Sequence, residues 1–135
     1  MVRGWNLLLT KAKLLWDKAK LGRWGEKRSE KFLKRAGFKT LTRNFSCKAG
    51  EIDLVMVDSD GSIVFVEVKS RADESFAPAE AVITSSKKHK LIKTARYFLS
   101  TNNIKDRPYR FDVVIIVLDE KGKEQIRHYR NAFVP

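Results

Sequence analysis

Two short apolar segments separated by a turn give the chain its clearest pattern, that of a β-hairpin. Residues 52–57 and 63–68 are rich in Val and Ile, as strands prefer. Between them, Asp58-Ser59-Asp60-Gly61 suits a type I turn followed by a left-handed glycine, which is a common hairpin loop. The pattern therefore predicts an antiparallel pair of strands over residues 52–68.

The predicted hairpin carries charged residues where a buried strand normally has apolar ones. If Asp58 pairs with Ser62, the register places Asp53 opposite Glu67. Side chains repeat every second residue, so Lys69 shares a face with Glu67, about 6.6 Å further along. A carboxylate in a buried strand costs several kcal/mol unless a metal or partner compensates it. The three side chains are therefore candidates for a functional site.

Elsewhere the pattern predicts helices and further strands. Apolar residues recur at helical spacing in residues 5–21, in residues 26–36 and in a helix whose predicted N-cap is Ser85 or Ser86 and which ends at Asn102-Asn103. Gly22 and Gly25 are predicted to separate the first two of these helices. Strands are predicted over residues 38–44, 110–118 and 126–129, with loops over residues 70–78 and 119–123 and a tail over residues 131–135.

This order of elements predicts a single α/β layer structure, with one domain over residues 22–135 and an amphipathic helix within residues 1–21. Three roles for that helix stay open. It could pack on the domain, lie at a membrane interface, or form a dimer or nucleic-acid contact, because lysines and tryptophans accompany its apolar stripe.

The charge balance favours a polyanionic partner. Lys and Arg number 28 against 16 acids, which gives a net charge of +12. The predicted helix after residue 85 is densely basic and has no Glu to pair at i+4, which favours phosphate contact. Its cations are Lys87, Lys88, Lys90, Lys93 and Arg96. The single cysteine, Cys47, and the lack of a long apolar run predict a cytoplasmic protein.

The hairpin acids are suitable ligands for Mg²⁺, with Mn²⁺ as a substitute, because hard cations prefer carboxylate oxygens. The Val68 carbonyl could add a ligand. Lys69 could then orient a water molecule or stabilise developing negative charge. Glu26 or Glu51 could add to this site, and Glu30 competes with Glu26 because it lies one helical turn later. Together these residues suit metal-assisted hydrolysis of phosphodiesters.

An acid followed by Glu-x-Lys on the next strand, after a helix that carries a Glu, resembles the PD-(D/E)xK pattern of restriction endonucleases and archaeal Holliday-junction resolvases. More closely, the chain resembles the bacterial YraN-like family of small endonuclease-like proteins. The matching segments are Gly25-Glu26, Arg43-Asn44, Gly50-Glu51-Ile52-Asp53-Leu54, Phe65-Val66-Glu67-Val68-Lys69-Ser70-Arg71, Lys87, Arg110-Phe111-Asp112-Val113-Val114 and Asn131-Ala132-Phe133.

This resemblance implies a restriction-endonuclease-like fold, with a mixed sheet flanked by helices. It implies that Glu26 is the acid of the first helix, that Asp53 and Glu67 are metal ligands, and that Lys69 is the catalytic lysine. Lys87 matches a basic helix position near the site. The proline of the superfamily's name is absent, since Ile52 precedes Asp53.

Three functions remain open from the sequence. The first is a Mg²⁺-dependent nuclease that acts on DNA rather than RNA, including branched or junction DNA, for which a homodimer would supply two active sites. The second is a nucleic-acid-binding protein with an inactive site, and the third is a factor that a membrane or partner recruits through residues 5–21. Lys87, Lys88, Lys90 and Arg71 are the expected nucleic-acid contacts.

Two other acids and bases have structural explanations. Asp112 is predicted to be a structural or outer partner, because it begins the buried strand over residues 110–118. His89 is predicted to face solvent or phosphate, and His128 to be partly packed.

Overall fold

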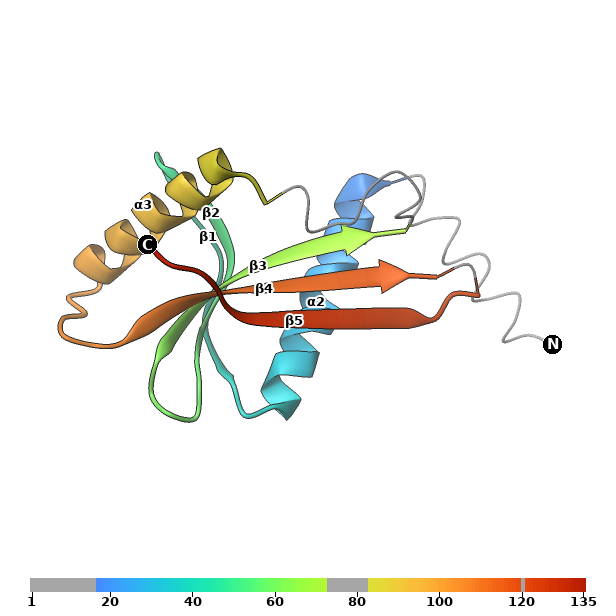
Figure 1. The fold of residues 1–135 in the computed structure, drawn as a ribbon, viewed down its shortest axis with the longest axis horizontal. Coiled ribbons are helices and arrows are strands. Elements are labelled where there is room, and N and C mark those ends of the chain that lie inside the picture. Colours follow the sequence, from blue (N-terminus) through green and yellow to red (C-terminus); the bar gives the residue numbers. More distant parts are fainter. Residues whose placement is uncertain (1–16, 73–82, 120) are drawn as a thin grey trace.

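A computed structural model describes residues 17–72, 83–119 and 121–135. Its centre is a five-stranded mixed sheet in the order β1-β2-β3-β4-β5 (Figure 1). Only the β3–β4 pair is parallel among these strands. The strands are β1 (Lys39–Cys47), β2 (Gly50–Val57), β3 (Ile63–Arg71), β4 (Tyr109–Leu118) and β5 (Glu124–Phe133).

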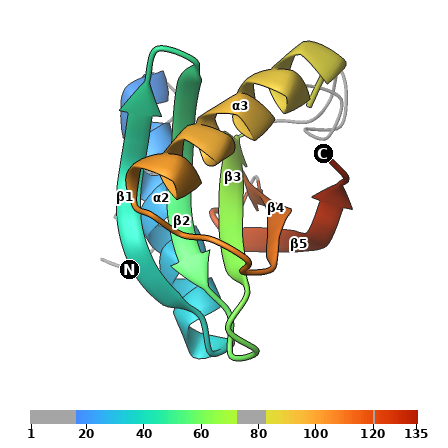
Figure 2. The ribbon, with the colours of Figure 1, turned by 90° about the vertical axis from the view of Figure 1, so that its left-hand side faces the viewer.

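Two helices cover opposite faces of the sheet: α2 (Lys18–Arg35) and α3 (Ser85–Thr101) (Figure 2). Each face has its own apolar core. Leu91, Ala95 and Phe98 of α3 pack against one face, as their predicted apolar stripe requires. Leu33 of α2 packs against the other face. The expected α/β architecture, a mixed sheet between helices, is therefore confirmed.

The predicted hairpin register is confirmed. The Asp58 N–H donates to the Ser62 carbonyl at 3.0 Å, and Leu54 pairs with Val66. Gly61 has a φ of 86°, which is the left-handed conformation that the loop demands. The observed turn therefore matches the register that the local sequence of the loop predicts.

The predicted break between the first two helices is wrong, because α2 runs without interruption through Gly22 and Gly25. Glycine keeps its backbone N–H, so it weakens a helix without ending it. Gly25 lies where α2 crosses β3: a Cβ at this position would be 1.7 Å from Ser70 Oγ. The glycine therefore permits close packing between helix and sheet.

The C-terminal strand is longer than predicted, since β5 includes residues 131–133 of the expected tail. Phe133 is buried, and its ring stacks on Phe111 with centroids 4.8 Å apart. This aromatic contact with β4 keeps the chain in the sheet beyond Tyr129. Similarly, β1 continues to Cys47, beyond the predicted end at Asn44.

Helix α3 begins with Thr84 as its N-cap, one residue before the predicted Ser85 or Ser86. Thr84 Oγ1 accepts a hydrogen bond from the Lys87 N–H at 3.3 Å. Threonine, like serine, is a residue type that caps helices in this way. Residues 1–16 of the predicted amphipathic segment and residues 73–78 of the predicted loop lie outside the described residues. The predicted start of this loop at Ser70 is wrong, because β3 continues to Arg71. No described helix is long and apolar enough to cross a membrane.

Candidate active site at the end of strands β2 and β3

Asp53 lies where β2 departs from the regular alternation of side chains between the two faces of the sheet. Ile52 packs in the core beneath α3, whereas Leu54, only two residues later, packs in the core beneath α2. Across from this point on β1, Asn44 has a φ of 52°, a left-handed conformation that asparagine tolerates. The backbone pairs of β2 and β3 extend only as far as Leu54 and Val66. Asp53 is therefore placed where the two strands separate.

The Asp53 carboxylate takes over the role of a backbone partner at this separation. Its Oδ2 accepts a hydrogen bond of 2.7 Å from the Val68 N–H. This bond ties the side chain to β3, two residues beyond the last backbone pair. It fixes Asp53 beside the segment that carries Glu67 and Lys69.

Glu67 and Lys69 form an ion pair on β3, with Lys69 Nζ 2.8 Å from Glu67 Oε1. Their side chains are only 15% and 17% exposed, so solvent screens this pair weakly. Lysine is therefore held next to the acids, as the two-residue spacing along a strand predicts.

The two glutamates of α2 have different partners. Glu26 lies close enough to Asp53 for its carboxyl group to raise the pKa of Asp53. Glu30, which is buried, instead accepts from the Thr40 hydroxyl and from Arg43 Nε. The sequence left these two acids as competitors, and the structure brings Glu26 to the hairpin and uses Glu30 to attach α2 to β1.

Burial dominates the electrostatics of the hairpin acids. It raises the pKa of Asp53 to about 7, and the neighbouring Glu26 adds to this rise, while the Val68 N–H and Lys69 oppose it. Burial also raises the pKa of Glu67 to about 7, and the Asp53 charge adds to this rise, while Lys69 opposes it. Lys69 therefore neutralises the acidic pair only in part.

A small cavity of about 150 Å³ opens on the α3 side of the acids. Burial, together with the nearby Lys69 charge, lowers the pKa of Lys87. Glu51 is exposed and lies at the same opening. The cavity is lined by Gly50, Glu51, Glu67, Lys69, Ile83, Lys87, Lys90 and Leu91.

The remaining predicted cations have other surroundings. Lys88 Nζ lies 5.7 Å from the centre of the Phe133 ring, so this lysine does not line the cavity with Lys87 and Lys90. Arg71 follows the ion pair on β3, and its guanidinium donates to the Ser70 carbonyl at 2.8 Å. Of the cations predicted to contact nucleic acid, the structure brings Lys87 and Lys90 together with Glu67 and Lys69.

Asp53 and Glu67 are the described carboxylates that could hold a divalent cation at this site. Among residues 17–72, 83–119 and 121–135, no three His, Cys, Asp or Glu side chains form a metal-binding group. A cation that takes only one or two carboxylates and keeps several waters is Mg²⁺.

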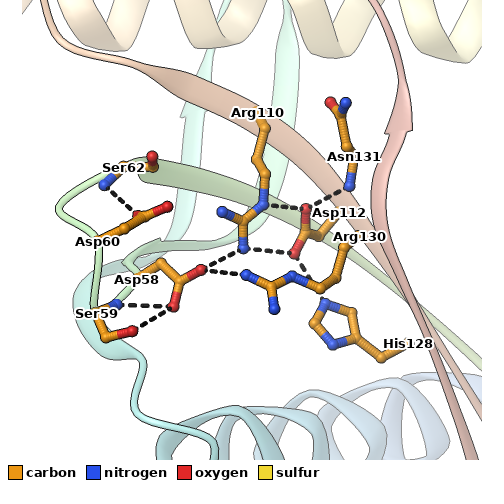
Figure 3. A network of polar contacts seen from close by, with 9 residues as sticks. All are labelled: Asp58, Ser59, Asp60, Ser62, Arg110, Asp112, His128, Arg130 and Asn131. Carbon is orange, nitrogen blue, oxygen red and sulfur yellow. Dashed lines mark hydrogen bonds and ion pairs between the residues drawn. The ribbon is translucent and has the colours of Figure 1, made fainter.

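A second charged network lies at the other end of the hairpin and has a structural role (Figure 3). Asp112, which is fully buried, lies 3.0 Å from Arg110 Nε and 2.8 Å from His128 Nε2. Arg110 and Arg130 both donate to Asp58. These contacts hold the pKa values of Asp58 and Asp112 below their usual range, mainly through hydrogen bonds that outweigh burial.

The structural interpretation of Asp112 and the partial packing of His128 are therefore confirmed, and His89 is exposed as predicted. Sequence reasoning treated Asp58 only as a turn residue and missed its two arginine partners. Arg110 could have indicated them, because an arginine that starts a buried strand needs a carboxylate nearby.

Comparison with known proteins agrees with the motifs. A model of the uncharacterised protein family UPF0102 matches residues 25–116. A UPF0102 protein of Pelobacter propionicus is 41% identical over 118 residues, which cover 87% of this chain and 84% of that protein. A second, from a Sulfurihydrogenibium species, is 42% identical over 117 residues, which cover 87% of this chain and 96% of that protein.

Similarity to solved structures is weaker. A repair endonuclease from Pyrococcus abyssi is 23% identical to this chain with a TM-score of 0.31, over 63% of this chain and 31% of that protein. Membership therefore rests on the sequence relatives and on the span of the family model. The chain belongs to the uncharacterised protein family UPF0102, the YraN-like family that its motifs resemble.

Proposed function

We propose that this protein is a metal-dependent nuclease that hydrolyses phosphodiester bonds in nucleic acid. One observation carries the proposal: Asp53 and Glu67 are neighbouring buried acids whose pKa values rise to about 7. Perturbed pKa values of this kind cluster at functional sites, where burial and neighbouring like charges act together. The adjacent Lys69 then matches the acid, acid and lysine set of metal-assisted hydrolysis.

In this proposal Asp53 and Glu67 hold Mg²⁺, which Mn²⁺ can replace. A bound cation of this kind polarises a phosphoryl oxygen and lowers the pKa of a coordinated water. Lys69 stabilises negative charge that develops on the phosphate, because its ammonium is held beside Glu67. Glu26 holds Asp53 in place and limits its ionisation through their contact.

The basic residues supply attraction to the phosphate backbone. Lys87 and Lys90 line the same cavity as Glu67, and the whole chain carries a net charge of +12. DNA is the favoured substrate, since the motif resembles that of DNA endonucleases, and branched DNA is the finer proposal. A homodimer would be needed to cut a junction twice.

The proposal can be tested by a cleavage panel of junction, flap, single-stranded and duplex substrates with Mg²⁺ or Mn²⁺. Asp53→Asn and Glu67→Gln should each abolish cleavage while they retain binding. The matched control is Glu124→Gln, the same change at a glutamate that pairs with Arg28 at the surface. Binding by wild type with no cleavage under either cation would instead support a nucleic-acid-binding protein with an inactive site.

A further inference from the structure

A second and larger cavity, of about 490 Å³, lies on the α2 side of the same strand end. The beginning of α2 and the end of β3 lie side by side there (Figure 1). Its polar lining consists of Lys18, Glu26, Lys69, Ser70 and Arg71, and Gly22 contributes a wall without a side chain.

This cavity adjoins the candidate active site and shares residues with it. Lys69 lines both this cavity and the smaller one beneath α3. Glu26 lines it and contacts Asp53. A group bound here would therefore lie directly next to the atoms that would handle the scissile phosphate, on the side opposite to Lys87.

Gly22 keeps the cavity open. A glycine makes a helix less stable than an alanine would, so a glycine inside a helix needs a structural explanation. Gly25 has one, because a Cβ there would collide with Ser70 Oγ. At Gly22 a Cβ would meet no atom of residues 17–72, 83–119 and 121–135 within 4 Å, so packing among these residues does not require the glycine. Any side chain at Gly22 would instead narrow the cavity.

The size and charge of the cavity identify its ligand class. A volume of 490 Å³ is within the range of pockets that enclose a small organic group, roughly 300–1,000 Å³. The three cations Lys18, Lys69 and Arg71 outnumber Glu26, which suits a group attached to phosphate. A base in a duplex is paired and stacked, and only an unpaired or extruded nucleotide can enter such a pocket.

We infer that the α2-side cavity binds an unpaired nucleotide adjacent to the scissile phosphate. This inference rests on the proposed function and deepens it. It restricts the substrate to nucleic acid with a single-stranded segment at the cleavage point, such as a flap, a gap or the branch of a junction. Fully paired duplex then binds only through phosphate contacts.

The test is equilibrium binding without divalent cation, so that it does not depend on cleavage. Fluorescence anisotropy in EDTA would compare a labelled flap and a labelled single strand with a blunt duplex. Gly22→Leu fills the cavity and should weaken binding to the flap and single strand roughly tenfold, or about 1.4 kcal/mol, with little change for the duplex. Thermal unfolding would verify that the variant is folded.

Lys20→Leu is the control, because it adds the same side chain to α2 at an exposed residue that does not line the cavity. It removes a charge, so it should weaken binding to all three substrates by a similar factor. Equal effects of Gly22→Leu on flap and duplex, or no effect on either, would overturn the inference. Selective binding by a protein that never cleaves would uphold the cavity and refute the nuclease.

Discussion

Asp53 Oδ2 accepts a hydrogen bond of 2.7 Å from the Val68 N–H, at the point where the backbone pairing of β2 and β3 has ended. A side-chain carboxylate thus accepts the hydrogen bond of a β3 backbone N–H beyond the last backbone pair with β2. The bond opposes the rise in the pKa of Asp53, but burial and Glu26 outweigh it. The hydrogen bond consequently holds Asp53 in position, and the raised pKa disfavours its ionised form.

Asp53→Asn should make the protein more stable at neutral and alkaline pH in the absence of divalent cations. The folded pKa of Asp53, about 7, exceeds the unfolded value near 3.9. The folded state therefore binds more protons than the unfolded state. The stability that Asp53 contributes is fully present below about pH 4 and is lost as the pH rises toward 7. Asn keeps the Val68 bond and avoids this loss, which is on the order of 2–4 kcal/mol.

Urea unfolding in EDTA from pH 4 to pH 9 would measure this effect. The gap between variant and wild type should open over the pH 4–7 window and then remain constant. Asp106→Asn is a suitable control, because Asp106 is exposed and its φ of 54° suits asparagine. A gap that does not depend on pH would contradict the assigned burial of charge.

Binding of Mg²⁺ should release protons at pH 6. Asp53 and Glu67 have pKa values of about 7, so both are largely protonated at that pH, and a cation requires them ionised. Calorimetry in two buffers of different ionisation enthalpy would count the protons released. Release should fall toward zero at pH 8.5, and affinity should rise between the two pH values.

The same titration with Asp53→Asn/Glu67→Gln should show neither heat nor proton release, whereas Glu124→Gln should behave as wild type. Proton release that persists in the double variant would mean that the cation binds to other groups.

Gly25→Ala and Gly22→Ala should have opposite effects on the free energy of unfolding. A Cβ at Gly25 would lie 1.7 Å from Ser70 Oγ and 2.9 Å from Ser70 Cβ, so overpacking should destabilise the protein by about 1–3 kcal/mol. The Cβ of Gly22→Ala would lie within 4 Å of no atom in the part of the chain that the structure describes, so this variant should stabilise α2 by about 0.5–1 kcal/mol. Adding Ser70→Gly should recover part of the Gly25→Ala loss, and additive effects in this double-variant cycle would argue against the contact.

Asp112→Ala should destabilise the protein by about 3–5 kcal/mol, because it leaves Arg110 and His128 without their buried carboxylate. Arg130→Ala should cost less than about 1 kcal/mol, since this side chain is 59% exposed and Asp58 keeps Arg110. Chemical denaturation of both variants would measure the difference. Similar costs for the two would show that the network does not depend on burial.

Local chemistry made much of this molecule predictable. The turn at Asp58–Gly61 sets the register of β2 and β3, because hairpin torsions involve only neighbouring residues. The apolar stripe of α3 and the continuous apolar run of β4 likewise follow from periodicity alone. Elements whose limits depend on distant packing, such as the end of β5 at Phe133, were predicted less well.

By itself the sequence determined that acids and a lysine lie at one end of a hairpin, since strand spacing is a local property. Only the tertiary structure decided which helix acid joins them, because the rotation of α2 on the sheet directs Glu26 toward Asp53 and Glu30 toward Arg43. It also decided that Gly25 packs tightly against Ser70, whereas Gly22 has space for a side chain among the described residues. Such pairings join residues far apart in the chain, so they depend on how whole elements pack.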